Sequence, residues 1–348
     1  MIKDYSKVPH TLNITNSKEY NVDFDLRFIE LELKAGQTLS LTIETSEQLA
    51  LFTNKAIELG LEIETEEPST KEVADEAVIK EALADETITE IKLDADIEIT
   101  EVLAPTHDIT IDGNGKTITS DKRAVNVEGV KVELKNVNLN VTEDTAVRAS
   151  KGGKVIIGSD AKITNTKGWG VTAFEEGTTV EINGTIETGS EPCIAGNGSA
   201  GKGNTNIVIN EGAKLVSDDI TIFIPQDGTV TINGGEIVGK TAIGIKSGTL
   251  NINGGTLTAT GDKVETLKAN SNGMAAWGDT IAIEVNKSYA GGKTDKNIKV
   301  NVAEEAVLTS ANADIIREYN PVADITTEVT GAYATKAEAG KNTFVYTK

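Results

Sequence analysis

Thr229-Val-Thr-Ile-Asn-Gly-Gly-Glu-Ile237 and Thr249-Leu-Asn-Ile-Asn-Gly-Gly-Thr-Leu257 are two copies of one sequence pattern. Each copy reads as a short strand with alternating aliphatic and polar residues, a turn formed by Asn and two glycines, and a second short strand. Ala242-Ile-Gly-Ile245 lies between the copies and alternates as a third strand. Three short strands that recur within about two dozen residues predict one coil of a parallel β-helix, stacked on its neighbour at roughly 4.8 Å.

The same register continues on both sides of these copies. In each coil, one aliphatic residue of the first strand serves as a marker of the register. The last spacing between successive markers, from Ile252 to Val302, is about twice as long as the others. We interpret the extra residues, 261–279, as a loop inserted before a third strand. The pattern predicts a mainly β solenoid of about eight to nine coils. One aliphatic marker of the first strand recurs at Ile111, Leu134, Ile157, Ile182, Ile209, Ile232, Ile252 and Val302.

A polar residue directly follows this marker in five of the coils. Amide side chains that stack on successive coils can hydrogen-bond to one another along the axis of the solenoid. We expect these residues to form a structural ladder without a catalytic role. They are Asp112, Asn183, Asn210, Asn233 and Asn253.

The composition restricts the classes of partner. The chain has 54 acidic and 33 basic residues and a formal net charge of −21, which argues against nucleic acid because phosphate binding requires a positive surface. Arginine occurs only at Arg27, Arg123, Arg148 and Arg317. One cysteine and two histidines provide neither a disulfide framework nor a thiolate or imidazole metal cluster, so no metal or cofactor is expected.

Targeting signals are also missing from the sequence given. No segment reaches the roughly 18 apolar residues of a membrane span, so we expect no membrane insertion. The residues after Met1 lack the apolar segment of an export signal. We therefore expect synthesis in the cytoplasm.

Residues 1–65 do not follow the repeat and predict a small α+β domain. Residues 23–33 and 38–43 alternate as strands, and a capping-box spacing precedes a helix over 49–59. Residues 66–85 predict a linker and then a helix over 71–85 that caps the open apolar end of the first coil. The parallel β-helix is expected over 86–318, and 319–348 is expected to close the far end.

Asp108-Ile-Thr-Ile-Asp-Gly-Asn-Gly-Lys-Thr-Ile118, followed by the repeated Asn-Gly turns, resembles the right-handed parallel β-helix proteins of the pectate-lyase-like superfamily. The resemblance covers roughly residues 73–318 and implies the fold. It does not select a function, because the superfamily includes lyases, hydrolases, adhesins and phage fibre or tailspike proteins.

The small N-terminal domain, the missing signal peptide and the acidity make the chain most similar to a phage virion protein, such as a head fibre, a capsid decoration protein or a tail protein. By this analogy, residues 1–65 dock on the capsid or another virion protein, and the β-helix projects from the virion surface. Phage fibres are often trimers, whereas a single-chain β-helix closes its own core. The sequence is therefore consistent with both a homotrimer and a monomer.

Catalytic residues are not expected. A lyase would need carboxylates clustered for Ca²⁺ and a basic residue, and a hydrolase would need two carboxylates facing each other across a groove. The best acidic pair is Asp218-Asp219, just before a third strand over 220–224. No His, Arg or second acidic pair occupies the equivalent place one coil away, so we interpret this pair as a solvated turn.

Four aromatic residues are candidates for glycan contact. Trp169 and Trp277 each precede a glycine just before a third strand, and Phe174 and Tyr289 lie near them in the sequence. Together they could form a platform on which sugar rings stack. The alternative is that they pack the loops 161–170 and 261–280 onto the β-helix.

Three functions stay open at this point. The first is a non-enzymatic phage structural protein that is anchored by its N-terminal domain and displays the β-helix, with adhesion to glycans or to the host surface. The second is a bacterial cell-surface β-helix adhesin. The third is a polysaccharide-degrading enzyme of the same superfamily.

Overall fold

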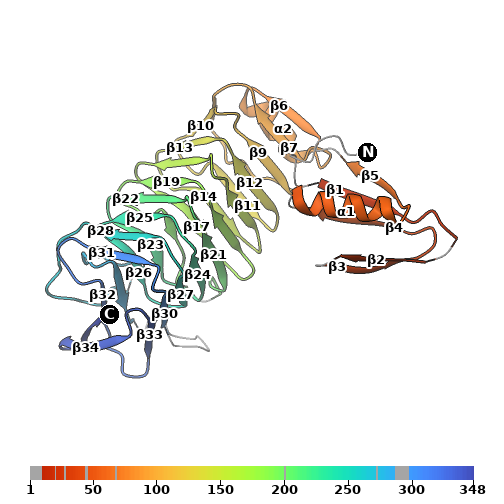
Figure 1. Ribbon diagram of the computed structural model, residues 1–348. Helices are drawn as coiled ribbons and strands as arrows, with labels where there is room; N and C mark the ends of the chain where they lie inside the picture. Colours follow the sequence, from red (N-terminus) through yellow and green to blue (C-terminus); the bar gives the residue numbers. More distant parts are fainter. Residues whose placement is uncertain are drawn as a thin grey trace. The chain divides into compact units, whose positions relative to one another are not determined.

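The chain folds into two compact units, residues 1–69 and 70–348, in a computed structural model (Figure 1). The structure describes residues 10–348 except 20, 27–28, 44–45, 67–68, 200, 272 and 287–297. Each unit has a hydrophobic core of its own.

The N-terminal unit combines a small antiparallel sheet, in the order β4-β1-β5, with one described helix. Leu49, Phe52 and Ala56 lie on one face of this helix and are buried in the core of the unit. Residues 23–33, predicted as one strand, form parts of two strands, β2 and β3, which pair antiparallel. The alternation continues through both strands and conceals the reversal of the chain. The elements are β1 (His10–Thr15), β2 (Val22–Leu26), β3 (Ile29–Leu33), β4 (Thr38–Ile43), α1 (Ser46–Glu58) and β5 (Glu62–Glu66).

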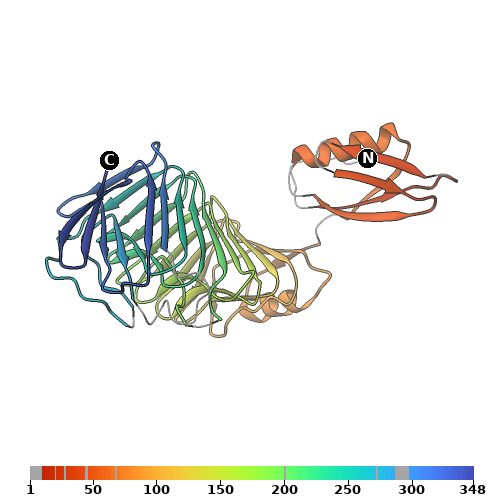
Figure 2. The same cartoon turned by 90° about the horizontal axis from the view of Figure 1, so that it is seen from below.

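The second unit is a parallel β-helix built from three sheets, as predicted (Figures 1 and 2). The first sheet contains β6 (Thr70–Val73), β7 (Glu90–Leu93), β9 (Ile109–Asp112), β12 (Lys131–Lys135), β15 (Lys154–Ile157), β18 (Thr179–Ile182), β21 (Thr205–Ile209), β24 (Gly228–Ile232), β27 (Thr249–Ile252), β30 (Ile298–Val302) and β33 (Thr327–Gly331). The second contains β8 (Ile97–Ile99), β10 (Thr117–Ser120), β13 (Asn138–Val141), β16 (Lys162–Asn165), β19 (Thr185–Thr188), β22 (Lys214–Ser217), β25 (Glu236–Gly239), β28 (Thr256–Ala259) and β31 (Val307–Ser310). The third contains β11 (Val125–Glu128), β14 (Thr145–Ser150), β17 (Trp169–Ala173), β20 (Ile194–Ala195), β23 (Ile220–Ile224), β26 (Thr241–Ile245), β29 (Ile281–Glu284), β32 (Ile316–Tyr319), β34 (Thr335–Gly340) and β35 (Thr343–Thr347).

Each complete coil contributes one strand to each sheet. Within the described residues, eight complete coils run from β9-β10-β11 to β30-β31-β32. The predicted register is confirmed, because every marker residue from Ile111 to Val302 is the direct partner of the next marker along the axis. These side chains point inward and form one continuous aliphatic core. The extra residues before β29 form the predicted insertion.

Both ends of the β-helix are covered by other structure. The helix predicted over 71–85 is shorter, because residues 70–73 form β6, which pairs parallel with β7 and begins the winding. The helix α2 (Glu76–Ala84) starts after Asp75, whose carboxylate accepts a hydrogen bond from the Val78 amide at 2.9 Å. Its buried side chains, Ile79 among them, join the aliphatic core next to β6 and β8.

The far end is closed by the C-terminal strands. Parallel winding continues past residue 318, because β33 pairs parallel with β30. In the third sheet, β35 reverses direction and pairs antiparallel with β32 and β34. The Tyr346 hydroxyl, buried at this end, donates a hydrogen bond of 2.5 Å to Glu318. An antiparallel final strand ends the repeat.

Four asparagine side chains form a hydrogen-bonded series along the axis. Each Nδ2 donates to the Oδ1 of the preceding coil, at 2.9 Å from Asn210 to Asn183, 3.1 Å from Asn233 to Asn210, and 2.9 Å from Asn253 to Asn233. An amide can donate and accept at the same time, so a column of asparagines satisfies itself.

Asp112 lies outside this asparagine series, contrary to the predicted ladder. The equivalent positions on the two following coils are Lys135 and Gly158, which cannot continue an amide column. The Asp112 carboxylate instead accepts a hydrogen bond from the Asn114 amide at 2.8 Å and lies 3.8 Å from the Lys135 ammonium group.

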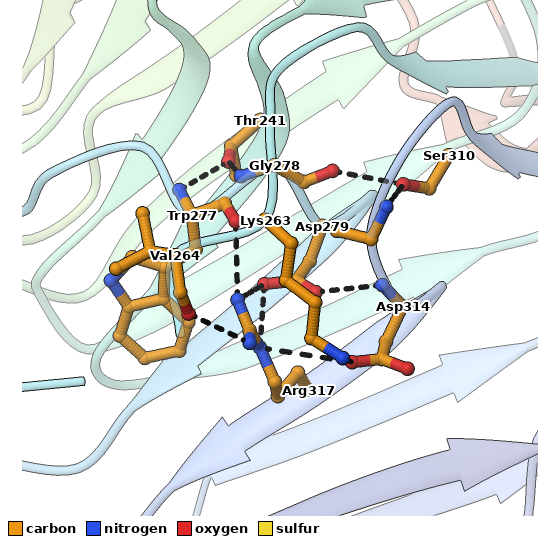
Figure 3. Close-up of polar contacts among 10 residues, drawn as sticks. Thr241, Lys263, Val264, Trp277, Gly278, Asp279, Ser310, Asp314 and Arg317 are labelled. Atoms are coloured by element: carbon orange, nitrogen blue, oxygen red, sulfur yellow. Dashed lines mark hydrogen bonds and ion pairs between the residues drawn. The ribbon is translucent and has the colours of Figure 1, made fainter. Parts of the chain in front are cut away.

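The insertion 261–279 is held against the outward side of the third sheet by two buried ion pairs. In the first, Arg317 of β32 contacts Asp279 at 2.7 Å and donates to the carbonyl oxygens of Val264 and Trp277 (Figure 3). Burial raises the pKa of Asp279 to about 6, although Arg317 opposes this rise. The insertion is therefore tied to the coil that follows it.

The second buried pair joins Lys246 to Glu284 at 2.7 Å. These residues follow Ile245 and Ile283, which are partners in the third sheet, so they are neighbours on adjacent coils. The backbone of Asn270 bridges them, since its carbonyl accepts from Lys246 and its amide donates to Glu284. Burial lowers the pKa of Lys246, and the hydrogen bond to Glu284 opposes this change.

Replacing Arg317 by Met should destabilise the protein by about 3–5 kcal/mol at neutral pH, because Asp279 is left as a buried charge without its partner. The loss should shrink at acidic pH. Without Arg317 the pKa of Asp279 rises further, so the folded state takes up a proton before the unfolded state does. Guanidinium unfolding at several pH values measures both effects.

Lys263→Met is the matched control for this experiment. It removes a half-exposed ion pair to Asp314 in the same cluster, with 36% and 31% of the two side chains exposed. Exposed pairs contribute at most about 1 kcal/mol. Equal losses for the two variants would show that the buried pair does not anchor the insertion.

Substitution within the asparagine series should produce graded losses of stability. Asn233→Ala removes two side-chain hydrogen bonds and should cost about 1–2 kcal/mol, whereas Asn253→Ala removes one and should cost about half as much. The free energy of unfolding in guanidinium measures the difference. Two variants as stable as the parent would exclude a stabilising role for the series.

Candidate functional site

A groove of about 620 Å³ lies on the outward side of the third sheet. Its floor includes Thr172 and Ala195, which are partners on adjacent coils and alternate with inward-pointing core residues. Because these side chains are small, the sheet surface is hollow here. Phe174 and Phe223 also line the groove, and its walls are formed by residues 196–199 and by Ser271, Gly273 and Met274.

Trp169 stands at the rim of the groove with 38% of its surface exposed. The turn before it is fixed by Asn165, whose Nδ2 donates to the carbonyl oxygens of Asp144 and Trp169 and whose Oδ1 accepts from the Gly168 amide. A Cβ atom at Gly168 would lie 1.6 Å from the Asp144 oxygen, so only glycine fits. This close turn places the indole outside the core.

Two carboxylates, Glu191 and Asp219, line the same groove on adjacent coils. Each lies three residues before one of the paired residues Ile194 and Ile222, so they occupy equivalent positions. The Ser217 hydroxyl connects their turns, because it donates to the Glu191 carbonyl at 3.0 Å and accepts from the Asp219 amide at 3.1 Å. Both side chains therefore belong to one column of the β-helix, that is, to one series of equivalent positions on successive coils.

This arrangement changes the interpretation of Asp218-Asp219 as a solvated turn for Asp219 only, whereas the expected absence of a second acidic pair one coil away holds. Asp218 is exposed, but Asp219 is partly buried and has Glu191 beside it. The partner is a single acid rather than an acidic pair. It precedes Pro192 in the most irregular coil, where the third strand is only two residues long.

Burial raises the pKa of both Glu191 and Asp219 above their ordinary values. For Glu191, the neighbouring charge of Asp219 raises the pKa further, while a hydrogen bond from Trp169 opposes the rise. For Asp219, Lys240 opposes the rise. The groove thus holds two like charges that are close together and partly shielded from water.

The other charges in the groove lining neutralise each other. Arg123 donates to both carboxylate oxygens of Asp144, at 3.2 and 3.0 Å. No ion pair to Glu191 or Asp219 occurs within the described part of the chain. The net charge of the lining is therefore negative.

The four predicted aromatic residues do not form one platform. Trp169 and Phe174 both line the groove, and the Arg148 guanidinium lies 5.0 Å from the centre of the Phe174 ring. Trp277 is only 3% exposed, and the Arg317 guanidinium lies 5.8 Å from the centre of the Trp277 ring. Its role is packing of the insertion, which was the alternative reading. Tyr289 lies outside the described residues.

Within the residues that the structure describes, no group of three or more His, Cys, Asp and Glu side chains is arranged to hold a metal ion. In the same residues, each helix is too short or too polar to cross a membrane.

Residues 70–194 match the family model described as "Putative pectate lyase-like adhesive domain". This segment starts at β6 and ends at β20, so it contains Trp169 and Glu191 but not Asp219. The match and the fold fit the β-helix superfamily.

A search of curated proteins gave no match. Among solved structures, the chain titled "L. reuteri 53608 SRRP" is similar over 75% of this chain and 98% of its own length, with 15% sequence identity and a TM-score of 0.29.

Proposed function

We propose that this chain is a non-enzymatic adhesin displayed on a surface, and that the groove beside Trp169 contacts glycans. The observation that carries the proposal is an exposed indole at the rim of a groove, on a β-helix whose first coils match an adhesive domain. Sugar rings present C–H faces that stack on indole and hydroxyls that hydrogen-bond to polar side chains. The groove supplies both kinds of contact.

A polysaccharide-degrading enzyme is the second candidate, because the groove contains two carboxylates. Glycoside hydrolysis uses two carboxyl groups that flank the scissile bond. Glu191 and Asp219 lie side by side on adjacent coils of the β-helix. Adjacent coils are about 5 Å apart, a separation that the carboxyl groups of a retaining hydrolase also have. Release of sugar products by the parent chain would therefore select this second candidate.

The surface that carries the adhesin is proposed to be a phage virion, with a bacterial cell surface as the alternative. Residues 1–69 form a compact unit with a core of its own, which fits a separate anchoring role toward a capsid or another virion protein. The β-helix closes its own core, so display requires no further subunit.

Trp169→Ala should weaken binding of the full chain to glycan-coated surfaces by roughly tenfold, or about 1.4 kcal/mol, because it removes the exposed stacking face. Val307→Ala, which trims another exposed apolar side chain outside the groove, is the control and should leave binding unchanged. Surface plasmon resonance against a glycan panel measures both. Release of reducing or unsaturated sugar products by the parent chain would contradict the non-enzymatic proposal.

A reporter fused to residues 1–69 should bind saturably to purified particles of the source phage, because this unit is proposed as the anchor. The same reporter fused to residues 70–348 is the control and should not occupy these sites. Fluorescence of sedimented particles and cells measures both fusions. Binding of the 1–69 fusion to the source bacterium alone would instead select the cell-surface alternative.

A further inference from the structure

The charge of the groove limits the chemistry of its ligand. Four ionised side chains line it, and two of these, Arg123 and Asp144, form an ion pair with each other. Glu191 and Asp219 are left to face the ligand. Uronic or sialic acids would add a third negative charge at short distance, whereas a cation would relieve the repulsion that is already present.

The position of Trp169 adds a second requirement. Trp169 and Glu191 both line the groove, and the Trp169 side chain lies close enough to the Glu191 carboxyl group to lower its pKa, so the aromatic face and the acidic group are adjacent. A ring that stacks on the indole therefore brings its substituents next to a carboxylate. A positively charged substituent would also be attracted by the electrons of the indole face.

Only two of the neighbouring coils carry an acid at this position. The equivalent position is Gly168 on the preceding coil and Lys240 on the following coil, so the acids occur on two adjacent coils and the Lys240 charge acts on Asp219. Two partly buried like charges at one place lower stability unless something compensates them, and such sites are typical of binding or catalysis.

From the groove, its unpaired acids and the adjacent indole, we infer that the ligand is a glycan with protonated amino groups, such as a polymer of non-acetylated 2-amino-2-deoxy sugars. The sugar ring stacks on Trp169, and its ammonium group donates charge-assisted hydrogen bonds to Glu191 and Asp219. This inference rests on the proposed function, because it specifies which glycans the groove selects.

The test compares a glucosamine tetramer with its fully N-acetylated counterpart, by calorimetry on the full chain. The amine tetramer should bind at least about tenfold more tightly, as expected for charge-assisted hydrogen bonds. Its affinity should decrease with rising salt. It should also pass through a maximum with pH, because Glu191 and Asp219 gain protons on the acidic side and the amines lose theirs on the basic side. Arg123, Asp144 and Lys240 are the other charged groups around this pair.

Matched variants assign the preference to the two acids. Combined Glu191→Gln and Asp219→Asn substitution should make the affinities for the two tetramers about equal. Trp169→Ala should weaken both tetramers by at least about tenfold, and the amine tetramer more, because its attraction to the indole face is also lost. Asp218→Asn is the control, because it removes the same charge from the adjacent exposed residue outside the groove. It should keep the preference.

The outcomes separate the inference from the proposed function. Equal affinity for the two tetramers, with loss of both in Trp169→Ala, would overturn the inference and leave glycan binding intact. Tighter binding of the acetylated tetramer would also overturn the inference. Binding of neither tetramer, together with no binding across a glycan panel, would overturn both.

Discussion

Stacking of equivalent residues on successive coils is the constraint on which the rest of this β-helix depends. Strand pairing in the first sheet runs in register from Ile111 to Val302 without a slip. A slip of one residue would turn every inward side chain outward, and the aliphatic core would be lost. Each position of a coil therefore becomes a column, and the surface is decided by what each outward column contains.

The outward columns of the third sheet explain both the groove and the insertion. Small residues, Thr172 and Ala195, leave the surface hollow where the groove lies, and Gly244 two coils further leaves space that Met274 of the insertion fills. Lys246–Glu284 and Arg317–Asp279 are buried where the insertion covers the sheet. Such pairs cost desolvation energy, but each fixes one arrangement because a charge without its partner would cost more.

The sequence was sufficient for features that repeat and insufficient for features that occur once. The spacing of aliphatic residues predicted the sheets, the coils and the insertion before β29, because every coil reports the same register. Glu191 was missed as the partner of Asp219 because the third strand of its coil is too short and irregular to align by pattern. Trp169 and Trp277 have the same local sequence context, a glycine and then a strand. Their burial differs because Trp277 belongs to the insertion and packs against Arg317 there.

The asparagine series and the acidic pair show what a column can and cannot satisfy by itself. An amide donates to one neighbour and accepts from the other, so Asn183 to Asn253 stack in series and stabilise the structure without outside help. Carboxylates only accept, so Glu191 and Asp219 repel each other in the same geometry. Lys240 on the following coil offsets part of the Asp219 charge, and the Trp169 side chain lies close enough to Glu191 to lower the pKa of its carboxyl group. The remaining acceptor capacity faces the groove, which is why the chemistry of this column is directed toward a cationic ligand.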